Sequence, residues 1–281
     1  MKIQSNPNIC SFWFLLFLLL LLLPQFLAQE VEDQRGFDYF EGSLRGPRHW
    51  GNIRTEWAAC KHGRLQSPID LLNYRVRVIP RLGELRMNYK PANATIKNRG
   101  HDIAIVWLGD AGSIQINGTN YALKQCHWHS PSEHSINGRK FDLELHMVHQ
   151  STNTSQRNNI AVLGLLYQLG EPDLFLSQLT QDLMLLNNAR REIPRGLVDP
   201  TAIRMGGTNY YRYFGSLTVP PCTEGVIWTI NKQINTVSRE QVLSLRLAVR
   251  DFAEINARPI QPINQRDIRL YGLMLPPEMR N

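Results

Sequence analysis

The sequence has 281 residues, of which 43% are hydrophobic, and carries a formal net charge of +7. Its 31 Lys and Arg residues are scattered and form no dense basic block with interleaved aromatic residues, which argues against nucleic-acid binding. The length suits a single β-rich domain, and no internal repeat divides the chain.

Residues 1–28 have the features of a secretory signal peptide. Phe12 to Leu23 is unbroken and apolar, the only charge is on Lys2, and Ala28 offers a small residue for cleavage. The apolar run is shorter than the about 20 residues that a membrane span needs. A retained signal anchor is the alternative. Cleavage would leave residues 29–281 as one domain, and no membrane span is predicted after the signal is removed.

Secretion is also indicated by three glycosylation sequons and by the cysteines. The sequons place glycans on Asn93, Asn117 and Asn153. Once Cys10 leaves with the signal, three cysteines remain, at positions 60, 126 and 222. In an oxidising compartment two of the three can pair.

Short strand-like runs, bounded by Gly, Asn and Pro, follow one another along the first half of the domain. The runs are Leu85–Tyr89, Ala94–Lys97, Asp102–Leu108 and Ser113–Ile116. Ile160–Leu166 is continuously apolar, which suits a strand buried on both faces. Helical spacing occurs over Asp173–Asn188, and the capping box Ser238–Gln241 opens a second helix to about Val249. Many strands and few helices predict a mostly β domain.

The strongest functional signal lies between Lys124 and Gln150. Side chains of a strand alternate between its faces, so His127 and His129 share one face while Cys126 points to the other. A second alternating run, residues 141–150, puts His146 on one face, and antiparallel pairing would bring it beside the first two histidines. Three imidazoles with a fourth position left open are typical of a catalytic zinc site.

Two further residues support a metal site over the alternative of unrelated buried or surface histidines. Gln125 and Glu144 each lie two residues before a predicted ligand, His127 and His146, on the same strand face. Ligand histidines usually donate their second N–H to such an amide or carboxylate.

This stretch resembles the α-class carbonic anhydrases. The family's elements appear in order as His127-Trp128-His129, Ser132-Glu133-His134 and Glu144-Leu145-His146-Met147-Val148-His149, and residues 128–134 resemble the plant branch. The resemblance covers about residues 37–275. It implies a large twisted, mixed but mainly antiparallel sheet with a few short helices. It also implies a Zn²⁺ ion and the reversible hydration of carbon dioxide to bicarbonate and a proton.

The resemblance also assigns roles in catalysis. Thr218, within Tyr213–Pro221, matches the family threonine that donates its hydroxyl to a carboxylate, here Glu133. His101 matches the proton shuttle, and its position after Gly100 in a turn suggests the rim of the site. Arg99 stands where the family commonly has a neutral amide, and we expect it to disturb the water chain.

Further matches concern the pocket and its surroundings. The positions that match the substrate pocket are Val148, Val162, Leu217, Thr218, Val219, Val226 and Trp228, and Val219 departs from the hydroxyl-bearing residue often found there. The supporting residues are Gln125, Glu144, His134, Tyr213 and Tyr39, the last in the segment 37–51 that resembles a wrap over the mouth of the site. Cys60 and Cys222 match the disulfide of extracellular members, which leaves Cys126 free.

The sequence is also compatible with two other functions. A storage or recognition module on the same fold is the main alternative, and a different zinc hydrolase is a third hypothesis. The expected location is extracellular, in the apoplast, or else the chloroplast stroma reached through the secretory pathway. A monomer is favoured.

Overall fold

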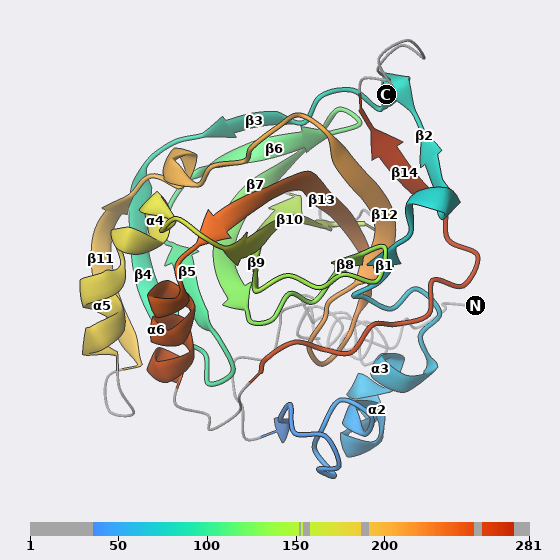
Figure 1. The fold of residues 1–281 in the computed structure, drawn as a ribbon, viewed down its shortest axis with the longest axis horizontal. Coiled ribbons are helices and arrows are strands. Elements are labelled where there is room, and N and C mark those ends of the chain that lie inside the picture. The colour runs from blue at the N-terminus through green and yellow to red at the C-terminus, as the bar shows by residue number, and fades with distance from the viewer. Residues whose placement is uncertain (1–35, 152, 154–157, 187–190, 250–254, 273–281) are drawn as a thin grey trace, which may run out of the picture.

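The centre of the molecule is a curved, twisted sheet of twelve strands (Figure 1). The computed structural model describes residues 36–151, 153, 158–186, 191–249 and 255–272. The predicted signal peptide, residues 1–28, lies outside the described residues. The twelve strands confirm the mostly β fold class.

Neighbouring strands of this sheet are often far apart in the sequence. Across the sheet the order is β11 (Glu192–Val198), β4 (Ala92–Asn98), β5 (Ile103–Trp107), β7 (Thr119–His129), β9 (Leu143–Ser151), β10 (Ile160–Leu169), β13 (Glu224–Val237), β12 (Tyr210–Ser216), β14 (Ile268–Tyr271) and β2 (Val76–Val78). Off this path, β3 (Arg86–Tyr89) pairs with β6 (Gly112–Ile116), which pairs with β7. β1 (Asp70–Leu71) and β8 (Ser135–Ile136) form a separate small sheet.

The sheet is mixed but mainly antiparallel, as predicted. Only the β10–β13 and β14–β2 pairs run parallel among the described strands of the large sheet. β10 lies between β9 and β13, and residues 160–166 are buried throughout. The continuous apolar run therefore reflects a central strand that is covered on both faces.

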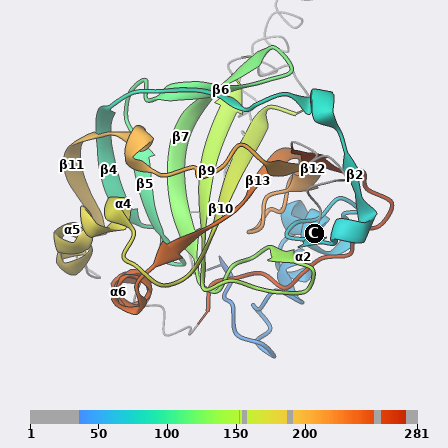
Figure 2. The ribbon, with the colours of Figure 1, turned by 45° about the horizontal axis from the view of Figure 1, so that its top comes forward.

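Helices cover one side of the sheet near its β11 end (Figures 1 and 2). They are α4 (Leu174–Ser177), α5 (Thr180–Leu185) and α6 (Arg239–Val249). The single helix expected over Asp173–Asn188 is wrong in detail, because i to i−3 hydrogen bonds at Gln178 and Leu179 separate α4 from α5. The capping box is confirmed: Gln241 N donates to Ser238 Oγ, and Ser238 N donates to Gln241 Oε1.

The two faces of the sheet carry different side chains. Cys126, Trp128 and Met147 join the main apolar core on the helix-covered face, where Trp128 stacks on Phe175. Alternation along β7 and β9 turns the histidines to the opposite face. The helix-covered core therefore supports the site from behind.

The N-terminal part of the described chain folds over the histidine side of the sheet. It contains α2 (Trp50–Ile53) and α3 (Ala59–His62), and its aromatic residues Phe37, Trp50 and Trp57 pack together. The predicted disulfide is confirmed: Cys60 bonds to Cys222, with 5.0 Å between their Cα atoms. Cys126 is buried with a free thiol, as expected.

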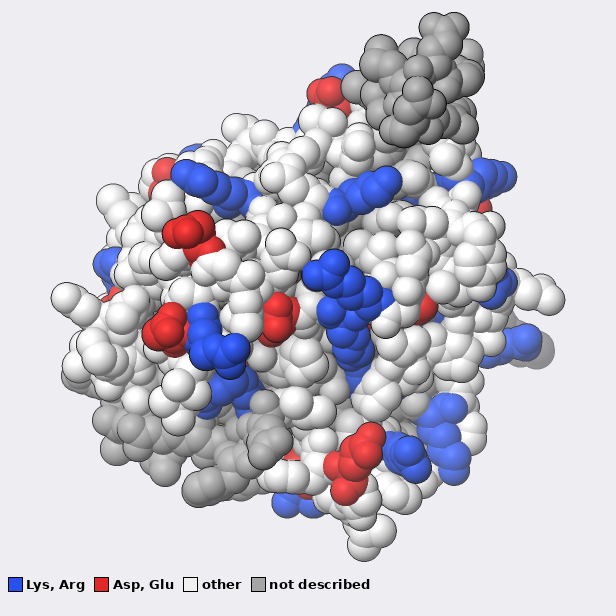
Figure 3. Space-filling model, viewed as in Figure 1, with Lys and Arg blue, Asp and Glu red and all other residues white. Residues whose placement is uncertain are grey.

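The outer surface carries charges of both signs. Lys and Arg are interspersed with Asp and Glu on the face shown in Figure 3. None of the described helices is both long enough and apolar enough to cross a bilayer.

Candidate metal centre

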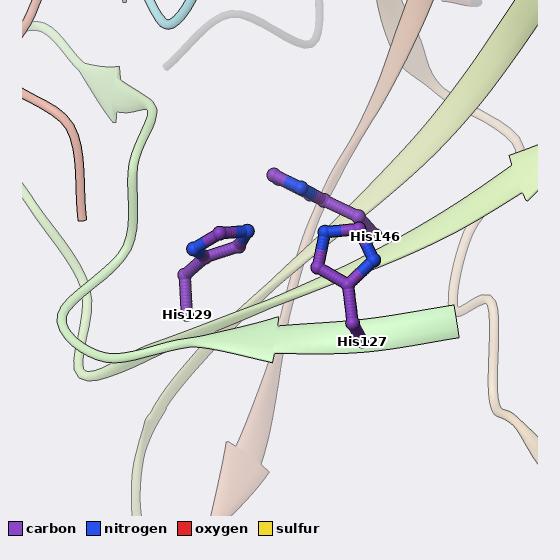
Figure 4. Close-up of side chains that lie close together, drawn as sticks. All are labelled: His127, His129 and His146. Carbon is purple, nitrogen blue, oxygen red and sulfur yellow. The ribbon is translucent and has the colours of Figure 1, made fainter. Parts of the chain in front are cut away.

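Three histidines converge on the concave side of the sheet, where β7 pairs with β9. A bulge between Leu123 and Gln125 sets the register, and His127 then lies directly opposite His146. Figure 4 shows His127 and His129 rising from one strand and His146 from its neighbour. One nitrogen of each imidazole lies within 4.8 Å of the other two, and all three residues are buried. The predicted convergence is therefore confirmed.

The outer nitrogen of each imidazole is occupied by an acceptor. His127 Nδ1 donates to Gln125 Oε1 at 2.8 Å, and His146 Nε2 donates to Glu144 Oε1 at 2.8 Å. His129 Nδ1 donates to the carbonyl of Asn256 at 2.7 Å, a partner that the sequence did not reveal. Because each acceptor fixes the proton on that nitrogen, the remaining lone pairs point inward.

The inward nitrogens fit a metal ion. His129 Nε2 is fully buried and has no hydrogen-bond partner among the described residues. A buried polar atom without a partner is costly unless something else satisfies it. Three histidine nitrogens are a donor set typical of catalytic zinc sites, which keep one position open.

The electrostatics also favour neutral imidazole. Burial, followed by the charge of Arg99 and the neighbouring histidines, holds the pKa of His127 well below its usual range. Burial alone would raise the pKa of Glu144, but His134 and His146 outweigh it and hold the pKa well below its usual range. Neutral imidazole and ionised carboxylate are the forms that metal binding requires.

A buried hydrogen-bonded chain continues outward from Glu144. His134 Nδ1 donates to Glu144 Oε1 at 2.7 Å, and the other ring nitrogen lies 2.6 Å from the Tyr213 hydroxyl. Tyr213 in turn lies 2.8 Å from Ser67 Oγ. A Cβ on Gly215 would approach that oxygen to 2.1 Å, so glycine is needed beside the chain. The network links His134 and Tyr213 to the carboxylate that accepts from His146, as expected for their predicted supporting role.

Glu133 and Thr218 are both buried, and Glu133 lies beside His129. Glu133 Oε1 accepts from the backbone N–H of Arg258 at 2.8 Å, while Oε2 lies 3.7 Å from His129 Nε2. Oε2 accepts no hydrogen bond from any described residue, so the expected bond from Thr218 is not formed. Arg258 holds only the other carboxylate oxygen, so the predicted role of Thr218 stays a prediction.

The expectation that His101 lies at an exposed rim is wrong. Its side chain is fully buried, its ring lies 5.2 Å from that of Phe37, and Nε2 is 3.5 Å from Asp102 Oδ2. Asn256 Nδ2 donates to the His101 carbonyl at 2.9 Å. Two segments from opposite ends of the described chain therefore cover the turn.

Arg99 is buried beside His101 and is not solvated. It forms two hydrogen bonds with Asp102, one of them from Nε to Oδ1 at 2.7 Å. Burial would raise the pKa of Asp102, but Arg99 and then His101 lower it to about 2. The charge of Arg99 is thus matched by a neighbouring carboxylate.

An apolar wall lies beside His146. Val162 pairs with Val148 on one side and with Trp228 on the other, and the Trp228 ring lies 4.8 Å from that of His146. Leu217 and Val226 belong to the same cluster. The predicted pocket residues Val148, Val162, Leu217, Val226 and Trp228 therefore meet at one wall.

Val219 and Tyr39 are not part of the cluster that contains this wall. Both belong to the aromatic cluster around Trp50 and the Cys60–Cys222 disulfide. The three sequon asparagines, Asn93, Asn117 and Asn153, are exposed.

Comparison with known proteins identifies the family. A model of eukaryotic-type carbonic anhydrases matches residues 45–272. The chain belongs to this family. The resemblance inferred from the histidine motifs is thus confirmed over nearly the whole domain.

Plant members of the carbonic anhydrase family are similar along most of the chain. Alpha carbonic anhydrase 4 of Arabidopsis thaliana is 51% identical over 242 residues, which cover 86% of this chain and 88% of the relative. Dioscorin DB3L of Dioscorea polystachya is 46% identical over 260 residues, covering 92% and 94% of the two chains. A crystal structure of dioscorin complexed with ascorbate superposes with a TM-score of 0.80 at 44% identity, covering 84% of this chain and 97% of that one.

Proposed function

We propose that this protein catalyses the reversible hydration of carbon dioxide to bicarbonate and a proton, with zinc held by His127, His129 and His146. The observation that carries the proposal is the inward convergence of three buried imidazole nitrogens. Each outer nitrogen already has an acceptor, and His129 Nε2 has no hydrogen-bond partner among the described residues. When bound, zinc lowers the pKa of water from 15.7 to about 7 and so supplies a nucleophile at neutral pH.

Glu133 and Thr218 orient the reacting oxygen in this proposal. Glu133 Oε2 is a buried acceptor beside His129 with no described donor. Rotation of the Thr218 hydroxyl toward it would leave the threonine oxygen as an acceptor for the reacting group. An ionised acceptor fixes such an orientation more firmly than a neutral one.

The apolar wall holds carbon dioxide, a small substrate without charge. Val148 is half-buried, while Val162 and Trp228 behind it are buried, so the wall offers apolar surface next to His146. A wall of this kind also excludes water from the carbon atom under attack.

His101 receives the proton in this proposal, but it must first move. In the described position its imidazole lies against Phe37 and close to Asp102. Turning outward would expose a group with an unperturbed pKa near 6.5, which suits proton exchange near neutral pH.

The buried position of His101 also favours the second candidate, a catalytically weak storage or recognition module. A protein that keeps the shuttle permanently covered would bind zinc but turn over slowly. The two candidates therefore differ in the rate of carbon dioxide hydration.

Measuring the zinc content of the purified protein and its rate of carbon dioxide hydration tests both candidate functions. We expect one zinc ion per chain, activity that disappears on chelation, and recovery when zinc is restored. A chain with zinc and only background hydration would support the second candidate. A chain that binds no zinc would exclude the proposed catalysis and leave the second candidate.

We also propose that the chain enters the secretory pathway and reaches the apoplast, with the chloroplast stroma as the alternative. The Cys60–Cys222 disulfide and the exposure of Asn93, Asn117 and Asn153 support this location. N-terminal sequencing and glycopeptide mapping of the protein from its source tissue test it. A mature chain that still begins at Met1 and carries no glycan would contradict it.

A further inference from the structure

A cavity of about 450 Å³ lies where β12, β13 and β14 meet. On β12, Tyr213 pairs with Trp228 in the cluster beside the histidines, so Arg212 and Phe214 point to the other face of the sheet. Ile227 of β13 and Ile116 of β6 contribute apolar surface to the cavity. The cavity is separate from the predicted zinc ligands. Its lining includes neither these histidines nor the residues that accept hydrogen bonds from their imidazoles.

Arg212 brings a buried positive charge into this cavity. Its exposed fraction is 7%, its Nε donates to Thr229 Oγ1 at 3.2 Å, and its guanidinium lies 4.7 Å from the centre of the Tyr210 ring. These two contacts fix the plane of the guanidinium. Nη2 is buried and has no hydrogen-bond partner among the described residues.

The carboxylates that also line the cavity are engaged with other groups. Glu224 Oε1 accepts from the Leu65 backbone at 2.6 Å and from Gln66 Nε2 at 3.0 Å. Asp267 Oδ2 accepts from Arg77 and Arg269 at 2.6 and 2.7 Å. Neither carboxylate forms an ion pair with Arg212 in the described part of the chain.

The cavity therefore keeps an excess of positive charge. Arg266, which also lines it, donates to the backbone carbonyls of Pro262 and Ile263 and not to a carboxylate. Burial, together with the nearby charge of Arg269, lowers the pKa of Arg212 from its usual value. A buried guanidinium donor without a partner is costly, and an anion that accepts from it would remove that cost.

We propose that this cavity binds a small organic carboxylate. The carboxylate would accept from Arg212 Nη2, and the body of the ligand would lie against Ile116, Phe214 and Ile227. A planar guanidinium matches a carboxylate better than it matches a point charge. The volume and the apolar walls exceed what an inorganic anion fills, and they suit a ligand with an apolar ring or chain.

Benzoate is a suitable probe, with benzamide as its neutral counterpart and inorganic phosphate as a small anion without an apolar body. Calorimetric titration of the zinc-loaded protein should show benzoate binding that is at least about tenfold weaker in Arg212→Gln, because one charge-assisted hydrogen bond is lost. Arg86→Gln, on the exposed surface of β3, is the matched control and should bind benzoate like the wild type. Benzamide should bind more weakly than benzoate.

The His146→Ala variant separates this cavity from the metal centre. Unchanged benzoate affinity in His146→Ala would support binding in the cavity. Loss of binding in His146→Ala with full binding in Arg212→Gln would place the carboxylate at the metal and overturn the proposal. Phosphate binding tighter than benzoate would also overturn it, because the apolar walls would then contribute nothing.

Two measurements guard against a folding defect in Arg212→Gln. Without ligand, the variant should melt no lower than the wild type, since it removes a buried charge that has no ion-pair partner among the described residues and whose Nη2 has no acceptor. If the variant does not fold, methyl NMR of the wild-type protein can show where benzoate binds. Benzoate should shift the methyl signals of Ile116 and Ile227, whereas shifts confined to Val148 and Val162 would contradict the proposal.

Discussion

The histidine triad and the turn that carries His101 lie close together, yet they are held in different ways. The triad is positioned by two adjacent strands, and two of its three outer acceptors lie two residues away in the sequence. His101 is held by Phe37 and Asn256, which come from distant parts of the chain. In the proposed function, metal binding therefore depends on a rigid local pattern, whereas proton exit depends on how remote segments pack over one turn.

The largest expected effect comes from breaking the triad. His146→Ala should remove zinc and reduce hydration to the uncatalysed background, because two ligands cannot hold the site. Metal analysis and a hydration assay measure both quantities. His62→Ala, an exposed residue of α3, is the control and should retain both. Full zinc occupancy in His146→Ala would remove this residue from the ligand set.

A smaller loss is expected when the ligand is kept and its support is changed. Glu144→Gln preserves the shape of the side chain but weakens acceptance from His146 and His134. We expect zinc affinity to fall by about 10- to 100-fold, as is usual for outer partners of ligand histidines. Competition with a chelator of known affinity measures it. Wild-type affinity in the variant would show that the strands alone orient His146.

The buried Arg99–Asp102 pair tests how the neighbouring turn is held. The pKa of Asp102 falls from 3.8 to about 2 on folding. The ion pair should therefore stabilise the protein by about 2 kcal/mol above pH 4, and this contribution should disappear as the pH falls from 4 toward 2.

Asp102→Asn is the comparison for this pH dependence. Its free energy of unfolding, from denaturant titrations at several pH values, should change less between pH 4 and pH 2 than that of the wild type. Parallel pH dependence in the two proteins would show that Asp102 does not carry the effect.

The smallest expected effect is on proton transfer. His101→Ala should slow turnover by roughly tenfold in weak buffer, less than the about 100-fold or more typical of a general acid or base because water can still carry part of the protons, while leaving zinc content unchanged. Added imidazole should restore the rate by carrying the proton. An unchanged rate in weak buffer would mean that the covered position described for His101 does not open during turnover.

Strand alternation predicted most of the proposed ligand set. Since side chains repeat every two residues along a strand, His127 and His129 share a face, and Gln125 and Glu144 share the faces of His127 and His146. The register set by the bulge before Gln125 then places His146 opposite His127. The capping box at Ser238 was equally local. The disulfide and the apolar wall came from resemblance to the family, because neither local spacing nor composition specifies which distant residues meet.

The remaining features depend on contacts between distant segments. Asn256 reaches His129 across 127 positions, and Arg258 reaches Glu133 across 125. Neither residue has a local pattern that marks it, so the way Glu133 is held and the covering of His101 could not be read from the sequence. Periodicity records which face a side chain takes, but it carries no information about which loop will cover that face. For the same physical reason, Arg212 was one scattered arginine in the sequence and became a buried cation with an unpartnered Nη2 only when β12, β13 and β14 came together.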